Sequence, residues 1–330
     1  MKDRPLVSIV VVAHNNWPDL DLALESALNQ TYKPVEVVLV DNGSTDQTET
    51  QVLARFAHRL KYIRQPNLDL AGGRNSGLQV ASGEFIQLLD GDDLLAPTKI
   101  ARQVEFFQAN PHVDVAIGRF RCFRSTPDVP AAKLWDYDAR EIADPKALFL
   151  DRCPAPPIVF LCRRRVYERL GPQDARLTFS EDLDYWLRAS FAGFRFALTP
   201  ESWSFYRRRQ GQKTEFRINT ALGDYACYTR ALRYVRDEPY RSLLLEKLAR
   251  MTLSIGHYYL YRGDGRRARR LLRRSARIWP ASAARPPKKW AEWLATVPGG
   301  PWMYRASRRV RGLQAPFAYD PGASARLAAG

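Results

Sequence analysis

The sequence predicts an α/β fold, in which a mostly parallel sheet carries helices on both faces, followed by a helical C-terminal region. In about the first 120 residues, β-branched apolar runs alternate with segments whose apolar residues recur at helical spacing. This alternation is typical of parallel sheets, because a parallel strand is reached through a crossover connection that is usually a helix. From about residue 218 onward the spacing of apolar residues is helical.

The expected strands are short apolar runs bounded by turn residues. The run LVSIVVVA at 6–13 is continuous and β-branched, as in a strand buried on both faces. Further strands of this region are expected at 35–40, 61–65, 84–89 and 112–118. Helices with one apolar stripe are expected between them, at 17–30, 44–58, 71–82 and 96–110.

The pattern beyond residue 118 is less regular. Residues 119–156, rich in proline, arginine and aromatic residues, are expected to form a long irregular connection with short pieces of structure. The α/β pattern resumes over 157–200 and ends in a short strand at 195–200. Residues 248–280 resemble one tetratricopeptide-type helical hairpin. The expected domains are 1–215, 216–280 and 281–330, the last a basic and partly irregular tail.

Charge is distributed unevenly along the 330 residues. The chain holds 51 Lys and Arg against 35 Asp and Glu, a formal net charge of +16. Residues 241–330 alone hold 19 basic and 4 acidic residues, which indicates an anionic partner for this part. No apolar run is long enough for a bilayer-spanning helix, and the N-terminus lacks a signal-peptide pattern. Since the four cysteines show no metal-ligand spacing, we expect reduced thiols in a cytoplasmic protein.

Three carboxylates end an apolar strand in the stretch EFIQLLDGDDLL: Asp90, Asp92 and Asp93. Ligands of parallel sheets bind beyond the carboxyl ends of the strands, and the loops 13–16 and 40–46 are expected at the same edge. Carboxylates this close repel one another unless a positive charge lies among them, and Mg²⁺ and Mn²⁺ prefer oxygen ligands. We therefore expect a divalent metal site; the alternative is a set of solvated acids that cap the next helix.

Four motifs occur in order along the chain: VSIVVVAHNN, VEVVLVDNGSTDQT, AGGRNSGLQVASGEFIQLLDGDD and FSEDLDYWLRASFAGF. Together they resemble the family 2 glycosyltransferases, which have the Rossmann-like GT-A fold, over about residues 5–210. The resemblance implies an enzyme that depends on Mn²⁺ or Mg²⁺ and transfers a sugar from a nucleotide sugar to a hydroxyl, with inversion of the anomeric centre. Residues 1–215 would then form the GT-A domain.

The resemblance also implies roles for individual positions. The nucleotide-sugar site would contain Ala13 and His14 at the nucleoside pocket, Asp41 on the base, Arg74 near the nucleotide, Asp90 on the ribose and Asp93 as a neighbouring acid. Asp92 is implied as the metal ligand, close to the diphosphate.

Asp182, in the stretch SEDLD, matches the catalytic base of the family. A base is needed because the acceptor hydroxyl must lose its proton when it displaces the nucleoside diphosphate. Glu181 is the second candidate. The alternative interpretation is that both acids merely cap the helix that begins here, since S-E-D before an apolar run is also a capping signature.

One position departs from the family pattern. Many relatives have Tyr-Arg-x-His near the end of the domain, where the histidine can ligate the metal, whereas here the stretch is FYRRRQGQKT and Arg209 stands at that position. Either the metal is held by Asp92, diphosphate and water, or the arginines at 207–209 neutralise the diphosphate directly. A solvated basic turn is the remaining alternative.

The stretch RGDGRRARRLLRRSAR at 262–277 holds eight arginines and one acid. At helical spacing the apolar residues share one face: Ala268, Leu271, Leu272, Ala276 and Ile278. Such a helix is typical of a protein that lies on an anionic membrane surface. Nucleic acid is an unlikely partner by comparison, and a merely solvated face is the third interpretation.

The predicted function is the transfer of one or a few sugars to a glycan or a lipid-linked glycan, from a donor that is most often a UDP-sugar in this family. The chain lacks the Gln-x-x-Arg-Trp signature of processive synthases. We expect a cytoplasmic protein, peripheral on the inner face of the membrane. The alternatives are a nucleotide-sugar-binding protein without turnover and a nucleotidyltransferase, which also uses paired acids and a metal.

Overall fold

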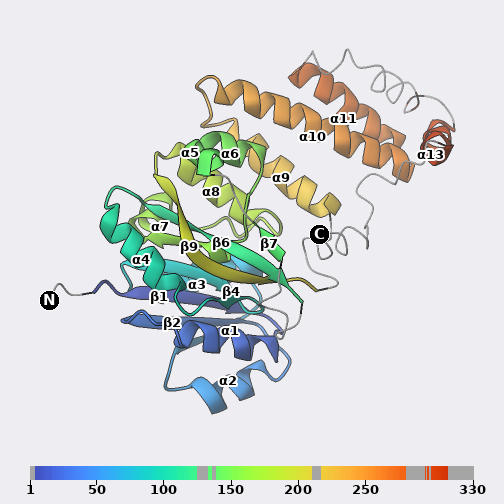
Figure 1. The fold of residues 1–330 in the computed structure, drawn as a ribbon. Helices are drawn as coiled ribbons and strands as arrows, with labels where there is room; N and C mark the ends of the chain where they lie inside the picture. The colour runs from blue at the N-terminus through green and yellow to red at the C-terminus, as the bar shows by residue number, and fades with distance from the viewer. Residues whose placement is uncertain are drawn as a thin grey trace. The chain divides into compact units, whose positions relative to one another are not determined.

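The computed structural model describes residues 4–124, 133–135, 139–209, 217–279, 294, 296 and 299–310. These residues fall into two compact units, 4–209 and 217–310, and each unit has a hydrophobic core of its own (Figure 1).

The first unit is a sheet covered by helices. Its strands are β1 (Val7–Ala13), β2 (Val35–Asn42), β3 (Lys61–Gln65), β4 (Phe85–Asp90), β5 (Leu94–Leu95), β6 (Val115–Phe123), β7 (Lys133–Trp135), β8 (Phe160–Arg163) and β9 (Phe196–Arg207). Its helices are α1 (Asp19–Leu28), α2 (Thr48–Phe56), α3 (Asp69–Val80), α4 (Lys99–Ala109), α5 (Ala139–Ala143), α6 (Pro145–Asp151), α7 (Arg164–Leu170) and α8 (Glu181–Phe191), with a 3₁₀ turn η2 (Pro157–Val159).

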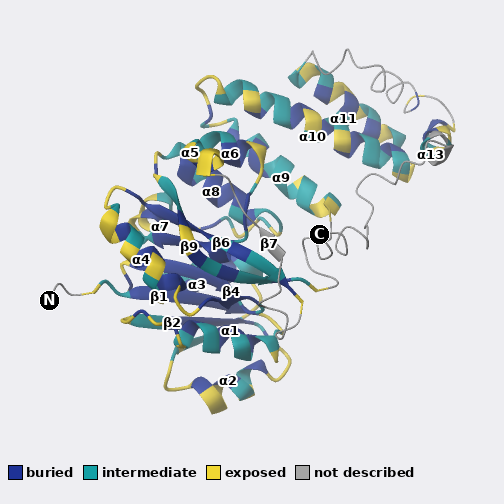
Figure 2. Cartoon of the chain, viewed as in Figure 1, coloured by how far each residue is buried: buried dark blue, intermediate teal, exposed yellow. Residues whose placement is uncertain are grey.

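The described strands form one sheet in the order β3-β2-β1-β4-β8-β6-β9-β5, with β7 paired to β6. Strands β3, β2, β1 and β4 pair in parallel, and β1 is buried along its whole length (Figure 2). Strand β8 is antiparallel to both β4 and β6, while β6 and β9 are again parallel. The predicted α/β fold is confirmed, and the antiparallel strand β8 is a feature that the sequence pattern did not indicate.

Helices cover both faces of the sheet. On one face α3 lies directly against β1, since a Cβ on Gly77 would come within 2.3 Å of a methyl carbon of Val10. On the other face α4 packs its Phe107 on Phe85 of β4, with ring centroids 4.7 Å apart. Val7 pairs in register with Phe85, and Val10 lies three residues further along β1, so it faces the opposite side.

The range 119–156 contains short pieces of structure, as expected, since α5 and α6 both lie within it. Strand β6 is longer than predicted, because it continues to Phe123. Helix α6 begins for a local reason, because the Asp144 side chain accepts a 3.1 Å hydrogen bond from the N–H of Ala147 and Pro145 fills the first turn. Strand β9 is also longer than predicted: it runs past Pro200 to Arg207, where its second half pairs with β6 and β5.

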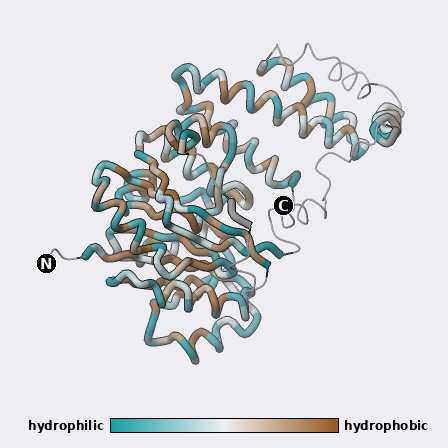
Figure 3. The backbone as a smooth tube through the Cα atoms, in the orientation of Figure 1, coloured by the Kyte–Doolittle hydropathy of each residue, from teal (hydrophilic) through white to brown (hydrophobic). Residues whose placement is uncertain are grey.

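The second unit consists of the helices α9 (Arg217–Ala231), α10 (Tyr240–Arg262), α11 (Gly265–Ile278) and α13 (Gly300–Val310). Helices α10 and α11 pack as a hairpin, in which a Cβ on Gly256 would lie 3.1 Å from Leu272 and the Ser275 hydroxyl donates to the carbonyl of Ala249 at 2.8 Å. Hydrophobic and hydrophilic residues alternate along these helices, as amphipathic packing requires (Figure 3). No helix in the described part of the chain has the length and hydrophobicity to cross a bilayer.

A buried lysine ties α4 to the sheet of the first unit. Lys99 is inaccessible to solvent, and its ammonium donates to the side-chain oxygens of Gln87 and Gln103. The amide of Gln103 in turn donates to the carbonyls of Ala116 and Val159 at 3.0 and 3.1 Å. Burial lowers the pKa of Lys99 to about 7, because the charged form is poorly solvated in the core.

Lys99→Met is therefore predicted to alter the pH dependence of stability. The ordinary pKa of lysine is 10.5, so between about 7 and 10.5 the unfolded state binds more protons, and the stability that Lys99 contributes grows as the pH rises. The parent protein should gain up to about 1.4 kcal/mol per pH unit relative to the variant in this window. Urea unfolding of both proteins at about pH 7 and about pH 9 measures this change, and a pH-independent difference would contradict it.

Candidate functional site

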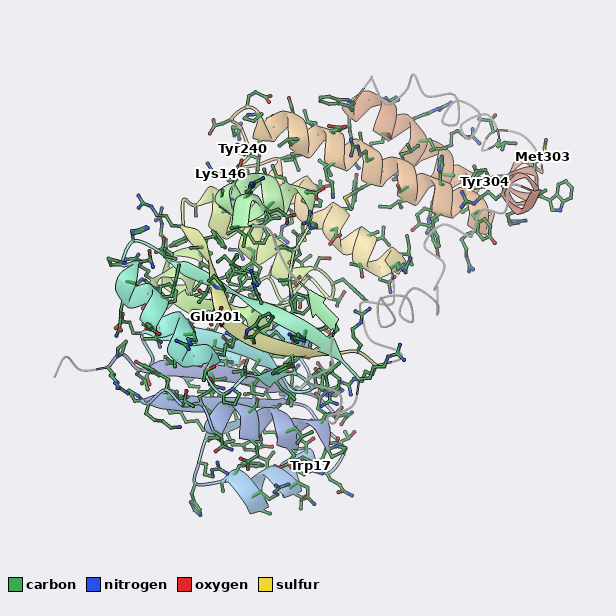
Figure 4. The ribbon with its side chains drawn as sticks, viewed as in Figure 1. Trp17, Lys146, Glu201, Tyr240, Met303 and Tyr304 are labelled. Carbon is green, nitrogen blue, oxygen red and sulfur yellow. The ribbon has the colours of Figure 1, made fainter. Side chains whose placement is uncertain are left out.

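The carboxyl ends of the parallel strands meet at one edge of the sheet. The register places Ala13 at the end of β1 beside Asp41 of β2, and Val12 beside Asp90 at the end of β4. Trp17, which is labelled in Figure 4, marks the position of the loop after β1. The loops that were expected to share this edge therefore do lie at adjacent strand ends, where parallel sheets bind ligands.

Asn15 joins the loop after β1 to the loop after β2. Its side-chain oxygen accepts hydrogen bonds from the N–H groups of Thr45 and Asp46 at 2.8 and 3.2 Å. Its own N–H donates to the hydroxyl of Ser44 at 3.0 Å. Asn15 has a φ of 52°, a left-handed conformation that asparagine adopts more readily than most residues. The two loops are thus held together without any ligand contact.

Asp41 is completely buried beneath the second of these loops. Its carboxylate accepts hydrogen bonds from the N–H of Ser44 and from the hydroxyl of Tyr62, each at 2.8 Å. Burial, and then the bond to Asp41, raise the pKa of Tyr62, so the phenol stays protonated and remains a donor. Asp41 shapes the loop here, and its contact with a nucleotide base stays a prediction.

Ala13 is buried and His14 is exposed at the same turn. Nδ1 of His14 lies 3.0 Å from the carbonyl oxygen of Asn42, so Nδ1 carries the proton in this contact. A Cβ on Gly91 would lie 3.1 Å from both the Ala13 Cβ and the Val12 carbonyl oxygen. The absence of a side chain at Gly91 therefore lets the turn after β4 approach the end of β1 closely.

The three clustered acids have different partners. Asp90 accepts a 2.9 Å bond from Arg74, and Asp92 accepts a 2.7 Å bond from Arg209. Burial raises the pKa of Asp92, although the charge of Arg209 opposes this effect. Asp93 instead turns into the protein, so only two of the three carboxylates remain partly accessible at this edge.

Asp93 has a structural role in this arrangement. Its side chain is completely buried, and one oxygen accepts a 2.8 Å bond from the N–H of Arg207 on β9. Burial, and then the charges of Asp92 and Asp90, raise the pKa of Asp93 well above its ordinary value. Asp93 therefore holds the end of β9 to the acidic turn, and its role in a nucleotide-sugar site stays a prediction.

Arg74 of α3 bridges the acidic turn and the start of α8. One nitrogen donates to Asp90 at 2.9 Å and another to Glu181 at 3.0 Å, while only 2% of the arginine side chain is exposed. Burial acts to lower the pKa of Arg74, but the charges of Asp90 and then Glu181 outweigh it, so the guanidinium stays charged. Arg74 was predicted near the nucleotide, and in this structure its contacts are with the protein's own carboxylates.

The start of α8 distinguishes the two candidate bases. Ser180 has a φ of 63° and makes no side-chain cap, so the helix begins abruptly at Glu181. Glu181 is buried against Arg74, and burial raises its pKa to about 6. Asp182 is only partly buried: Oδ1 accepts a 2.8 Å bond from the N–H of Leu183, and Oδ2 lies 3.7 Å from the sulfur of Cys153. Asp182 is the more accessible of the two acids.

Two arginines, one at the end of β9 and one just after it, bind the acidic turn. Arg207 is 4% exposed and donates to the carbonyl of Asp92 at 2.7 Å, while Arg209 is more open, with 43% of its side chain exposed. Both guanidiniums also reach Asp19 of α1, at 3.4 and 3.5 Å. Arg209 is therefore hydrogen-bonded to the Asp92 carboxylate, which was predicted to hold the metal.

The carboxylates at this edge fit a divalent cation only in part. Within the described residues, no three acids, histidines or cysteines cluster closely enough to enclose a metal. Magnesium-type ions, however, are usually held by one or two carboxylates together with water and substrate phosphate. Asp92, with Asp90 beside it, meets that requirement once Arg209 has released the Asp92 oxygen.

Comparison with known proteins identifies the family. The model of Glycosyl transferase family 2 matches residues 8–171. The putative glycosyltransferase EpsE of Bacillus subtilis is 31% identical over 201 residues, which cover 59% of this chain and 70% of EpsE. The chain belongs to glycosyl transferase family 2.

A second relative has a more specific name. The UDP-Glc:alpha-D-GlcNAc-diphosphoundecaprenol beta-1,3-glucosyltransferase WfaP of Escherichia coli is 38% identical over 104 residues, which cover 31% of this chain and 41% of WfaP. The chain spans less than two thirds of several curated relatives, for example 38% of an uncharacterized glycosyltransferase of Haemophilus influenzae and 58% of one of Rickettsia typhi.

Solved structures of other proteins share the fold. S. aureus TarS 1-349 in complex with UDP-GlcNAc superposes with a TM-score of 0.62 at 17% identity, over 93% of this chain and 92% of that one. The mannosyltransferase PcManGT from Pyrobaculum calidifontis, in complex with GDP-Man and Mn²⁺, gives 0.56 at 19% identity, over 95% of this chain and 89% of that one. The expected glycosyltransferase fold is confirmed.

Some residues that organise this site were not predicted. Asn15 follows the first strand in the stretch AHNN, and an asparagine after a strand is a signal for a left-handed turn. Asp19 and Cys153 gave no such signal, because their contacts come from segments that are distant in sequence. Figure 4 shows how densely side chains fill the space around the sheet that brings these segments together.

Arg74→Ala is predicted to destabilise the first unit by about 3–5 kcal/mol, because it leaves Asp90 and Glu181 without their buried partner. Arg102→Ala is a matched control, since Arg102 is 53% exposed and pairs with Glu105 at the surface; its effect should stay below about 1 kcal/mol. Urea unfolding compares the two variants. Equal small losses would show that the Arg74 bridge does not hold the site together.

Proposed function

We propose that this chain is an inverting glycosyltransferase that moves a sugar from a nucleotide sugar to an acceptor hydroxyl. The observation that carries the proposal is the buried Arg74 bridge, which joins Asp90, the implied donor carboxylate, to the first turn of α8, where Asp182 lies. A single rigid contact thus connects the residues proposed for donor binding with the residue proposed for proton removal.

In the proposed reaction Asp182 accepts the proton of the acceptor hydroxyl while the oxygen attacks the anomeric carbon. The bond from that carbon to the diphosphate breaks in the same displacement, so one base and one attack invert the centre. Glu181 is less suited to this role, because its carboxylate is buried and already bonded to Arg74. Arg207 and Arg209 lie where they could stabilise the leaving diphosphate by charge-assisted hydrogen bonds.

Asp92, with Asp90 beside it, is the proposed holder of Mn²⁺ or Mg²⁺, a cation that would neutralise the charge of the leaving diphosphate. A Mn²⁺ ion accompanies GDP-Man in the PcManGT complex, which supports this cofactor class. Because Arg209 bonds to the same Asp92 carboxylate that would hold the cation, we propose that cation binding and the release of Arg209 are coupled.

The proposed donor is a UDP-sugar, and the proposed acceptor is a lipid-linked glycan of cell-surface polysaccharide synthesis. TarS has been crystallised with UDP-GlcNAc, and the name of WfaP gives a UDP-Glc donor and a diphosphoundecaprenol-linked acceptor. The basic C-terminal region would then hold a cytoplasmic enzyme at the anionic inner surface of the membrane. Thermal-shift measurements with UDP-, GDP- and dTDP-sugars, with and without Mn²⁺, test the donor class, since a donor at about 100 times Kd adds about 2.7 kcal/mol of stability.

One observation favours a second candidate function, a nucleotide-sugar-binding protein without turnover. The Asp92–Arg209 pair at 2.7 Å neutralises the carboxylate on which metal-dependent transfer would rely. A nucleotidyltransferase would not call for a carboxylate at Asp182. Transfer of labelled sugar from the donor identified by thermal shift decides between turnover and binding alone.

Asp182→Asn is predicted to lower transfer by about 10²- to 10⁴-fold, the usual contribution of a general base, and to leave donor affinity unchanged. The exposed Asp151 supplies a matched control, since Asp151→Asn removes a carboxylate that is 66% exposed and pairs with Arg152 at the surface. Single-turnover transfer and calorimetric donor binding measure the two effects. Transfer at the parent rate would assign Asp182 to the helix start alone, and Glu181→Gln would then be the variant to measure.

Arg209→Ala is predicted to have opposite effects on metal and nucleotide. Without nucleotide, Mn²⁺ should bind up to about fivefold more tightly, because the competing ion pair, which is partly exposed, is worth about 1 kcal/mol or less. When no metal is added, UDP should bind at least about tenfold more weakly, because a charge-assisted hydrogen bond is lost.

Arg208→Ala is the matched control for this prediction, because it removes the same charge from a neighbouring residue whose guanidinium stacks on Tyr206. Calorimetry with Mn²⁺ alone and with UDP alone gives both affinities. If Arg209→Ala and Arg208→Ala changed them equally, Arg209 would have no specific link to Asp92.

A further inference from the structure

The arginines of α11 form one uncompensated stripe. Arg266, Arg270, Arg273 and Arg277 are all exposed and follow the spacing i, i+4, i+7, i+11, so they share one face of the helix. None of the four forms an ion pair with an acid in the described part of the chain. Like charges at this spacing destabilise a helix slightly, so an anionic partner would relieve their repulsion.

The apolar face of α11 is only partly available to such a partner. Ala268 and Leu272 are fully buried in the core of the second unit, together with Leu260 of α10 and Tyr304 of α13. Leu271, Ala276 and Ile278 are partly exposed. The helix therefore presents its arginines and only a part of its apolar face to an outside partner.

Exposed apolar side chains are found instead on α13. Trp302 is 66% exposed and Met303 40% exposed, whereas the next residue, Tyr304, is buried in the core (Figure 4). Helix α13 is held beside the end of α10, because the guanidinium of Arg305 donates to the carbonyl of Tyr261 at 2.9 Å. The chain turns into α11 immediately after this point, so α13 lies beside the end of the hairpin where α11 begins.

We infer that the arginine stripe of α11 and the Trp302–Met303 pair of α13 form an interfacial surface that binds anionic lipid. The inference assigns the proposed membrane attachment to named residues. It rests on the proposed function only for the reason why the protein would lie on a membrane. Arginines supply the attraction to an anionic leaflet, and an exposed tryptophan prefers the boundary between headgroups and acyl chains. An acidic protein or a double-stranded nucleic acid would use the arginines but would not require an exposed Trp–Met pair, since it is the bases of single strands that stack on exposed aromatic rings.

Vesicle co-sedimentation of the whole protein tests the charge component. Binding is expected to vesicles of phosphatidylcholine mixed with phosphatidylglycerol and not to phosphatidylcholine alone, and it should weaken with salt because exposed charges are screened beyond about 10 Å at 0.1 M. Changing the four stripe arginines to Gln should weaken binding by about 10²- to 10³-fold, as each basic residue near an anionic leaflet contributes about a factor of five.

A variant with the same charge change controls for net charge. Arg55, Arg59, Arg102 and Arg176 are exposed arginines of the first unit, and changing them to Gln should leave vesicle binding within about tenfold of the parent. Equal losses in the two quadruple variants would overturn the assignment to α11. Thermal unfolding of both variants reports whether either change disturbs the fold, and a stable stripe variant with parent binding would likewise overturn it.

The tryptophan separates lipid from other polyanions. Quenching by brominated phosphatidylcholine in the anionic vesicles should decrease in Trp302→Phe. Trp302→Ala with Met303→Ala should weaken vesicle binding while leaving binding to a double-stranded DNA oligonucleotide unchanged. Leu53→Ala, at an apolar residue of the first unit that is 47% exposed, is the matched control. Unchanged quenching in Trp302→Phe, or tighter binding to the oligonucleotide than to the vesicles, would overturn the lipid assignment. None of these measurements depends on sugar transfer, so they can fail independently of the proposed enzyme activity.

Discussion

The site depends above all on one buried guanidinium. Arg74 comes from α3 and Asp90 from the end of β4, whereas Glu181 comes from the start of α8, 107 residues after Arg74 in the chain. A buried charge that loses its partner is destabilising by several kcal/mol, so these three segments are stable only when they are together. The bridge therefore fixes the distance between the acidic turn and the first turn of α8 before any ligand arrives, which is the preorganisation that transfer chemistry needs.

Local sequence patterns could predict the edge of the sheet but not the bridge across it. Ala13, Asp41 and Asp90 end apolar runs, and parallel pairing alone brings such strand ends together. The partners of Arg74 could not be predicted in this way, because they depend on packing between distant segments. The same reason explains the second half of β9: Pro200 and several polar residues hide a strand whose stability comes from pairing with β6 and β5.

The acidic turn illustrates a second limit of sequence patterns. Three carboxylates within four residues suggest one cluster, yet a turn and a change of strand send their side chains in different directions. Asp93 is directed into the protein and fixes the end of β9, whereas Asp90 and Asp92 stay at the edge with an arginine each. The chemical character of the residues was therefore predictable, while the division between structural and accessible acids required the fold.

The charge of the assembled site provides a physical reason for pairing a cation with the donor. Carboxylates outnumber arginines around it. The carboxylates are Asp19, Asp90, Asp92, Asp93, Glu181 and Asp182, and the arginines are Arg74, Arg207 and Arg209. This surplus of acidic groups would repel a diphosphate, and a divalent ion would offset it. Of the three arginines only Arg209 is substantially exposed, so it is the one that can move from Asp92 to an incoming phosphate while Arg74 and Arg207 keep the frame intact.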